Sequence, residues 1–404
     1  MTVSFILVWS SMLAQKLGFS DSEEDEEVLL VACTYAIKKR RLEEQLARSF
    51  AIGARLLLDA YVKYRGGLNA LANFDVPAEP LFHFERYCEK LFVQDFRFNK
   101  AQVNCIVESL VAVAGIPKEI CSDSQDKTDL RTAFLCLCMK YAWPTRLGRM
   151  VQLFGKSISW ISRIVSKLRK LLCNFCQPKM RSPPTLSSAD LQRFSSAVEH
   201  VSGIDVVFAF LDATVRPICR PSVGQKECYN GKDRLHAIKF QICSTPDGII
   251  QHLDGPWPGR RHDHHMVNSA PLSTGTPALV SWILSHPRTA HGTAFLVYAD
   301  QGYYSQAGIE TPWPDAAYNL EHQVFNDMMK SSRIAVEWEF DHILEHWASL
   351  HFKPSQKLLT GGIGQQYVVA AFLTNVFNCL HPSKTSVYFK VAPPDLHTYL
   401  QRLK

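Results

Sequence analysis

The sequence has no uninterrupted apolar run of the length needed to cross a bilayer, which is about 20 residues. Residues 1–19 are mildly apolar, but they lack the basic start and the small-residue cleavage site of a secretory signal. We therefore expect a first helix there and no membrane partner. The sequence also shows no internal repeats.

Cysteine spacing of the kind that builds metal sites or disulfide frameworks is nearly absent. The chain has 12 cysteines, but only Cys173 and Cys176 form a Cys-x-x-Cys pair, and no second pair follows at the distance of a zinc site. We interpret the cysteines as reduced thiols of an intracellular protein.

Acidic residues are missing from one long segment. Residues 140–181 contain ten Lys or Arg and no Asp or Glu, so with a net charge of +6 the rest of the chain sums to about −4. An acid-free basic block is the pattern expected of a segment that binds phosphate backbones.

Two helices are expected inside this basic block. Residues 147–154 predict a short helix, Gly155-Lys156-Ser157 a turn with a helix cap, and residues 158 to 172 a second helix. This pattern is typical of a helix-turn-helix that binds DNA, although many small helical domains pack in the same way. The apolar positions that recur at spacings of 3 and 4 and should be buried are Ile158, Ile161, Val165, Leu168 and Leu172. The candidate DNA-binding residues of the block are Arg146, Arg149, Lys156, Arg163, Lys167 and Lys170.

The remaining pattern places helices before the block and strands followed by helices after it. Helices are expected within residues 82–121, with Asn99 as an N-cap, and over 126–141. The Pro- and Ser-rich residues 177–192 read as a linker. Strands are expected over 204–211, 237–243, 249–253 and 295–299, and helices over 323–351 and 365–377.

Three acidic residues belong to different apolar segments of this second half. Asp212 follows VVFAFL, Asp300 follows AFLVYA, and Glu337 lies beside the apolar stripe of the helix over 323–351. Carboxylates are costly to place beside buried strands, and three that converge repel one another unless a divalent cation holds them. Such an arrangement is what two-metal phosphodiester cleavage requires.

The same region resembles the PIF/Harbinger-type transposases, the group that includes the Harbinger-transposase-derived nucleases. The resemblance spans roughly residues 205–375. The strings that carry it are LDATVRPICRP from Leu211, YNGKDRLHAIKFQ from Tyr229, GPWPGRRHDHHM from Gly255, ADQGYYS from Ala299, FNDMMKSSRIAVEWEF from Phe325 and KPSQKLLTGGIGQQYVVAAFLTN from Lys353.

The resemblance implies an α/β chain, in which an N-terminal all-α helix-turn-helix region precedes an RNase H-like catalytic domain with a mixed sheet flanked by helices. It implies that Asp212, Asp300 and Glu337 are the DDE triad, holding Mg²⁺, which Mn²⁺ can replace. The expected organisation is an N-terminal helical segment (1–80), a helical DNA-binding region (81–180), a linker (181–204) and the nuclease domain (205–404).

Residues near Glu337 leave alternatives open for the third acid of the triad and for the role of Arg333. Glu339 and Asp341 lie on the same helix as Glu337, which is preferred because it aligns with the V-E-x-x-F string of the family. Arg333, one turn before Glu337, is expected either to pair with it or to clamp a phosphate.

The GRRHDHH string adds a fourth acid, Asp263, which is expected to act as a metal ligand or as a partner that supports the site. Arg260 and Arg261 are candidate phosphate contacts. A zinc hydrolase that uses His262, Asp263 and His264 is a less favoured alternative, because adjacent residues rarely all reach one tetrahedral ion.

The leading prediction is thus a divalent-metal-dependent DNA endonuclease or transposase. The main alternative is a domesticated relative that binds DNA or protein and no longer cuts. The resemblance also admits a separate Myb-like DNA-binding partner and an oligomer. We expect the protein in the nucleus, or in the cytoplasm without that partner. The basic residues 38–41 fit either a nuclear-import signal or a solvated helix end.

Overall fold

The computed structural model describes residues 76–404, apart from residues 78, 269–277, 290 and 359–360. Contacts between residues divide the chain into two units, 1–75 and 76–404. The expected first helix, the basic residues 38–41 and nearly all of the predicted segment 1–80 therefore lie outside the described residues. Within those residues, no helix is both long and apolar enough to span a membrane.

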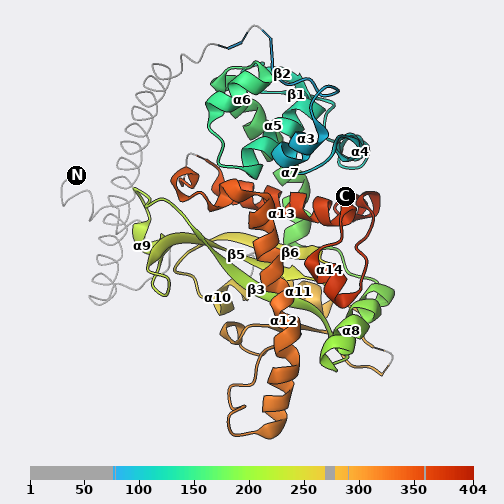
Figure 1. The fold of residues 1–404 in the computed structure, drawn as a ribbon. Coiled ribbons are helices and arrows are strands. Elements are labelled where there is room, and N and C mark those ends of the chain that lie inside the picture. Colours follow the sequence, from blue (N-terminus) through green and yellow to red (C-terminus); the bar gives the residue numbers. More distant parts are fainter. Residues whose placement is uncertain (1–75, 78, 269–277, 290, 359–360) are drawn as a thin grey trace, which may run out of the picture. The chain divides into compact units, whose positions relative to one another are not determined.

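The N-terminal part of the second unit consists of helices and one short hairpin (Figure 1). Asn99 caps α4 through a capping box with Gln102, as predicted. The helix expected over 126–141 begins only at Leu130, because residues 127–129 pair with residues 119–121 as a two-stranded hairpin. The elements are α3 (Glu89–Phe96), α4 (Lys100–Ala112), β1 (Glu119–Cys121), β2 (Lys127–Asp129) and α5 (Leu130–Ala142).

Helices α6 (Leu147–Phe154) and α7 (Ile158–Arg181) and the turn between them are present. Gly155 has a φ of 60°, which favours glycine, and Ser157 accepts a hydrogen bond from the backbone N–H of Trp160. Four of the five expected apolar residues on α7 are buried and Ile158 is half-buried. The interpretation of these helices as a DNA-binding helix-turn-helix stays a prediction.

The linker that we predicted is mostly helical. Helix α7 continues to Arg181, with Pro178 in its last turn, and after residues 182–187 helix α8 (Ser188–Ser202) begins with Ser187 as its cap. Serine favours a helix N-cap as much as a loop, so the composition was misleading here.

A mixed sheet follows, in the order β6-β5-β3-β7-β8, with the two-residue β4 also beside β5. β5 runs antiparallel to β3 and β6, whereas β7 is parallel to β3 and β8. This order with flanking helices is consistent with the predicted RNase H-like fold. The bounds are β3 (Val207–Pro217), β4 (Tyr229–Asn230), β5 (Leu235–Ser244), β6 (Ile250–Pro258), β7 (Leu296–Ala299) and β8 (Ile309–Glu310).

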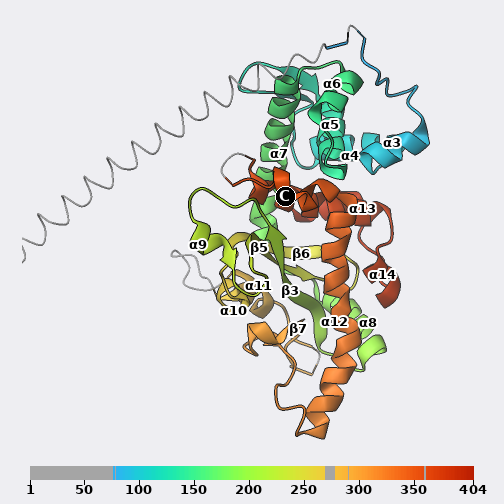
Figure 2. The same ribbon diagram turned by 60° about the vertical axis from the view of Figure 1, so that its left-hand side comes forward.

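Helix α12 (Leu320–His346) passes across the sheet and continues beyond it, as Figures 1 and 2 show. Its expected stripe of Val336, Phe340, Ile343 and Trp347 is buried. The smaller elements are α9 (Gln225–Cys228), α10 (Asp263–Val267), α11 (Ala278–Leu284), η1 (Gln301–Tyr303), η2 (Ala348–His351), η3 (Lys353–Ser355), α13 (Ile363–Leu380), α14 (Lys384–Phe389) and α15 (Leu396–Arg402).

One continuous apolar core joins the N-terminal helices to the sheet region. Phe98 lies beside Trp347, with ring centroids 6.3 Å apart, and Arg97 donates a hydrogen bond of 2.9 Å to the carbonyl oxygen of His346. Helix α7 itself crosses the boundary that we placed at residue 180. The predicted border between the helical region and the nuclease domain therefore does not coincide with a break in packing.

Glu339 on α12 is buried within this core and does not face solvent. The hydroxyl of Thr385 donates a hydrogen bond of 2.6 Å to it, and the side-chain amide of Asn378 lies 3.4 Å from its other oxygen. Burial raises the pKa of Glu339 from 4.5 to about 8. Glu339 is thus a member of a buried network, which removes it as a rival to Glu337.

The raised pKa predicts a pH-dependent stability. Between pH 4.5 and about pH 8 the folded protein keeps a proton on Glu339 that the unfolded chain has released, so the free energy of unfolding falls as pH rises. Glu339→Gln, which cannot ionise, should therefore be increasingly more stable than wild type from pH 5.5 to pH 8.5. Urea unfolding at several pH values measures this difference, and a difference that is constant over this range would contradict the assignment.

Candidate active site

Asp212 and Asp300 lie on neighbouring parallel strands. Leu211 of β3 pairs with Ala299 of β7, which is the last residue of β7, and Asp300 follows it. We expected Asp212 to follow its strand, but β3 continues beyond it, because β5 pairs with β3 as far as Pro217. The two acids thus meet where the parallel part of the sheet ends and the antiparallel part continues.

Arg333 lies between Glu337 of α12 and Asp212 of β3. One terminal nitrogen of its guanidinium lies 2.9 Å from Glu337 Oε1 and the other 3.8 Å from Asp212 Oδ2. The predicted pair between Arg333 and Glu337 is therefore present, and Arg333 also approaches an acid from another element. A single positive charge joins the carboxylates of β3 and α12.

The Asp212 carboxyl group is poorly solvated. Burial raises its pKa from 3.8 to about 6, and the charges of Asp300 and Asp263 add to this effect. The backbone N–H of Ala213, 2.7 Å from Asp212 Oδ1, and the charge of Arg333 act in the opposite direction. The group therefore lies where an additional cation would be stabilised.

The hydroxyl of Tyr303 is a feature that the sequence analysis missed. Tyr303 belongs to η1, directly after Asp300, and its hydroxyl is buried without a hydrogen-bond partner among the described residues. Burial raises the pKa of Tyr303 well above its usual value, and the charges of Asp263, Asp212 and Asp300 raise it further. All three carboxylates are thus close enough to Tyr303 to act on its pKa.

Asp263 lies near Asp300 but is engaged by a lysine. It is the first residue of α10, and its carboxylate forms an ion pair with Lys239 of β5, whose ammonium also donates a hydrogen bond of 3.0 Å to the carbonyl of Arg261. A Cβ atom at Gly302 would be 3.6 Å from Asp263 Oδ2 and 3.7 Å from Asp300 Oδ2. Gly302 therefore leaves room between the two carboxylates.

The histidines of the same loop do not converge. His264 lies 3.0 Å from the carbonyl oxygen of Tyr303, and its ring centroid is 6.0 Å from that of His265 and 4.9 Å from that of Tyr304. His262 precedes α10 and is exposed. The predicted zinc alternative gains no support from this geometry.

Two basic residues of α7, Arg163 and Lys167, have acidic partners from outside the block. Arg163 binds Asp126 with both its Nε and a terminal nitrogen, the latter at 3.2 Å, and Lys167 lies 3.0 Å from Asp123. Both acids belong to the turn between β1 and β2. The face that we expected to be purely basic therefore carries two ion pairs, while Lys170 is exposed and none of its contacts is an ion pair within the described residues.

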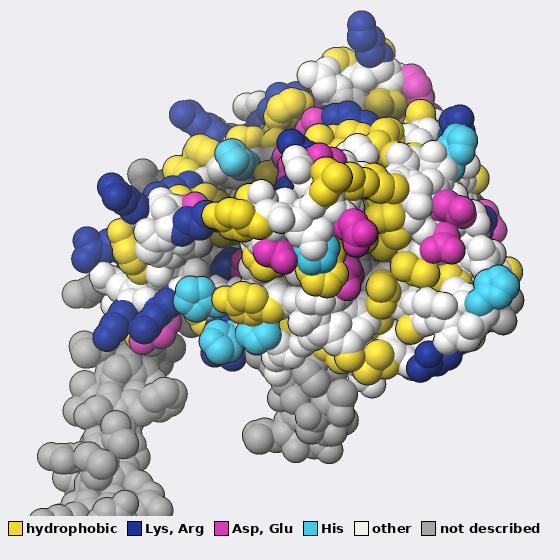
Figure 3. All heavy atoms as spheres, turned by 90° about the horizontal axis from the view of Figure 1, so that it is seen from below, with side chains coloured by type: hydrophobic (Ala, Val, Ile, Leu, Met, Phe, Trp, Pro, Cys, Tyr) yellow, Lys and Arg dark blue, Asp and Glu magenta, His cyan; other side chains and the backbone are white. Residues whose placement is uncertain are grey.

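The other predicted DNA contacts are spread over two regions. Arg146 and Arg149 are exposed on α6, where Arg149 lies 3.5 Å from Asp95, and Lys156 lies over the ring of Trp160. Arg260 and Arg261 are exposed beside α10. In Figure 3, which shows the molecule from below, Lys and Arg side chains are most numerous towards the left of the view, and Asp and Glu lie mainly in the middle and towards the right.

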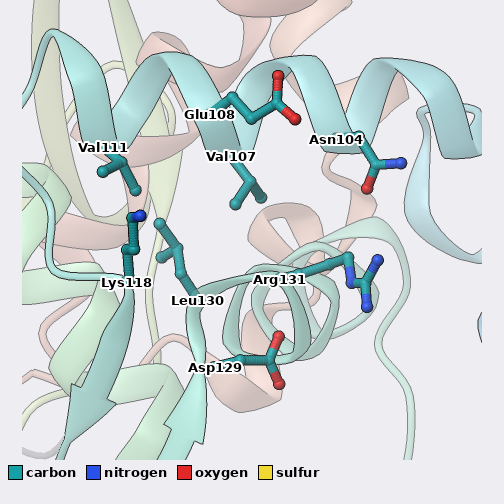
Figure 4. Close-up of a pocket in the computed structure, with 8 residues that line it drawn as sticks. All are labelled: Asn104, Val107, Glu108, Val111, Lys118, Asp129, Leu130 and Arg131. Atoms are coloured by element: carbon teal, nitrogen blue, oxygen red, sulfur yellow. The ribbon is translucent and has the colours of Figure 1, made fainter.

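A groove on the described surface lies away from these acids. Figure 4 shows this groove of about 510 Å³ between α4 and the start of α5, where Glu108 and Asp129 face Lys118 and Arg131. None of the residues that line it belongs to β3, β7 or α12. Its mixed charges give no preference for one class of ligand.

Residues 211–375 match the family model described as DDE superfamily endonuclease. Searches of curated proteins and of solved structures found no match. The matched segment contains Asp212, Asp263, Asp300 and Glu337. This segment of the chain is therefore similar to DDE endonucleases, which supports a nuclease-type activity in general.

The carboxylates fit a hard divalent cation in their chemistry. Oxygen donors are what Mg²⁺ prefers, and the desolvated Asp212 with Arg333 beside it shows that positive charge is accommodated there. Yet the described residues contain no group of three or more His, Cys, Asp or Glu placed to hold an ion. Instead, Arg333 neutralises Asp212 and Glu337, and Lys239 neutralises Asp263. A bound cation would therefore displace Arg333 from Asp212 and Glu337.

Proposed function

We propose that this protein is a divalent-metal-dependent DNA endonuclease or transposase of the PIF/Harbinger type, which cuts phosphodiester bonds and joins strands at element ends. What supports the proposal is that Asp212 and Asp300 lie on neighbouring parallel strands and that Arg333 links Asp212 to Glu337 of α12. The sequence strings support the Harbinger type, and the family match supports the reaction class.

In this proposal Asp212, Asp300 and Glu337 hold the cations. Asp263, at the start of α10, supports them while it is paired with Lys239 of β5. A bound divalent cation would activate a water or a 3′-hydroxyl and stabilise the leaving oxygen. Arg333, once released from Asp212 and Glu337, can contact the phosphate through its planar guanidinium. Arg260 and Arg261 would hold the flanking strand.

Cleavage of supercoiled plasmid by the purified full chain tests the proposal. We expect nicked and linear products with Mg²⁺ or Mn²⁺, and none with excess EDTA. Cutting that persists in EDTA would refute metal dependence. Specific binding of DNA or protein without any cutting, in either metal and over a range of DNA ends, would instead identify the domesticated relative.

We further propose that the basic face of α7 binds DNA, and that nuclear localisation and a separate Myb-like partner or an oligomer accompany this role. DNA phosphates would compete with Asp126 and Asp123 for Arg163 and Lys167. Asp126 and Asp123 would then lower the affinity of α7 for DNA without blocking the binding of DNA.

This arrangement predicts that two single substitutions change the affinity for DNA in opposite directions. Lys170→Ala should weaken DNA binding and lower the slope of log K against log salt by roughly 0.9, as one lost phosphate contact does. Asp126→Asn should strengthen binding, because Arg163 no longer has a competing carboxylate. Anisotropy titrations at several salt concentrations measure both, with the exposed Lys90→Ala on α3 as a control. Unchanged slopes would place the DNA surface elsewhere, most simply at Arg260 and Arg261.

A further inference from the structure

A second cavity, of about 370 Å³, lies where the N-terminal helices meet the C-terminal segment. Helices α5, α6 and α7 form one side, and η2, η3 and the start of α13 form the other. None of the acids of the candidate active site lines it. The cavity therefore needs an explanation of its own.

Two cations line this cavity and no carboxylate does. Lys140, in the last turn of α5, makes neither an ion pair nor a hydrogen bond with any described residue, and burial lowers its pKa. Arg169 donates hydrogen bonds to the carbonyl of Gly361 (3.0 Å) and the hydroxyl of Ser166 (3.1 Å), while its Nε is buried without a partner. These cations differ from Arg163 and Lys167, which have carboxylate partners, because their charge is uncompensated.

Hydroxyl groups surround the two cations. Tyr141 is 2% exposed and its hydroxyl has no hydrogen-bond partner among the described residues, although its ring packs against Trp347. An unpaired buried hydroxyl is costly, so a ligand that accepts a hydrogen bond from it would be stabilised. The other hydroxyl residues that line the cavity are Thr145, Ser162, Ser166, Ser349 and Ser355.

The ligand that fits these donors is an anion with several acceptor oxygens. A phosphate group accepts hydrogen bonds from lysine, arginine and hydroxyls at once. The cavity volume is at the lower end of the roughly 300–1,000 Å³ of small-molecule sites, so it takes more than a bare ion. Leu147, Ile161, Val165 and Phe352 add an apolar wall, against which a sugar or a base can pack.

We propose that this cavity binds a nucleotide phosphate, with Lys140, Arg169 and Tyr141 as its donors. The phosphate arrives either as a free deoxynucleotide or as a phosphodiester of a DNA strand. This binding does not depend on cleavage at Asp212, so its test and the test of the endonuclease are separate.

Thermal unfolding of the full chain with phosphate, dAMP or a short single-stranded oligonucleotide tests the proposal, with NaCl at matched ionic strength as the reference. The variants are Lys140→Met and Tyr141→Phe, and Lys90→Met is the matched control on an exposed lysine. We expect a ligand-dependent rise in Tm for wild type and Lys90→Met. Calorimetric titration should show at least about a tenfold loss of affinity in Lys140→Met, because a charge-assisted hydrogen bond is removed.

The variants also separate a ligand site from a structural role. Without ligand, Tyr141→Phe should be at least as stable as wild type, because it removes a buried hydroxyl that has no partner among the described residues. Lys140→Met should not lose stability, because it breaks no ion pair or hydrogen bond with a described residue. If both variants lose stability and the ligand effect persists, the cavity is only a packing defect and the proposal fails.

The choice of ligand distinguishes the two sources. A rise in Tm with phosphate or dAMP identifies a site for a free nucleotide. If Tm rises only with the oligonucleotide, and Lys140→Met abolishes that rise, the cavity contacts a DNA strand. No rise with any of the three, or one that Lys140→Met leaves unchanged, overturns the proposal.

Discussion

Glu337→Ala is expected to remove metal-dependent DNA cleavage, whereas Asp341→Ala, one turn further along α12, should cut like wild type. Arg333 joins Glu337 to Asp212, while Asp341 is exposed one turn beyond that contact. The loss should exceed the ~10–100-fold that removal of a supporting partner costs, because the proposed function makes Glu337 a direct ligand of the ions. Asp212→Ala and Asp300→Ala should be as inactive as Glu337→Ala.

Initial rates of plasmid nicking measure these effects, and circular dichroism checks that each variant is folded. Asp341 is a matched control because it has the same charge on the same helix. If Glu337→Ala cut normally and Asp341→Ala did not, the third ligand would be Asp341. Glu339 is no longer a candidate, because it is buried beside Thr385.

The second large effect is expected on stability. Asp263→Asn removes the carboxylate partner of Lys239, whose side chain is only 9% exposed. We expect a loss of about 2–3 kcal/mol in the free energy of unfolding, below the ~3–5 kcal/mol of a fully buried pair, because Asp263 itself is 30% exposed. Lys239→Met in the same chain should recover most of this loss, since no unpaired charge remains.

Urea unfolding of the single and double variants measures this coupling, with Asp123→Asn as the control for an exposed pair. In cleavage assays, Asp263→Asn should lose less activity than Asp212→Asn, and higher Mg²⁺ or Mn²⁺ should restore part of it. Equal losses without rescue would make Asp263 a direct metal ligand. Absence of coupling between positions 239 and 263 would show that the ion pair does not stabilise the fold.

The sequence predicted the features that depend on local pattern. The buried stripe of α12, the hairpin of β5 and β6, and the cap at Asn99 follow from spacing and turn chemistry, which neighbouring residues determine. The apolar strings before Asp212 and Asp300 gave the strands of the candidate site, although β3 continues past Asp212.

The features that were missed depend on contacts between distant segments. Asp126 and Arg163 are 37 positions apart, and no local pattern connects the turn of a short hairpin to α7. The pair of Lys239 and Asp263 likewise arises only when β5 lies beside the start of α10. The serine-rich stretch before α8 was misread because serine serves caps and loops equally well.

Helix α7 has mechanical consequences for the whole second unit. Its 24 residues give a length of about 36 Å, and it packs on α5 and α6 in its first half and on α13 and β6 in its second. It contains no glycine, and its proline lies in the last turn, so it has no point at which to pivot. The helix therefore joins the packing of α5 and α6 to that of α13 and β6, so a displacement of the N-terminal helices is expected to displace the β6 edge of the sheet as well.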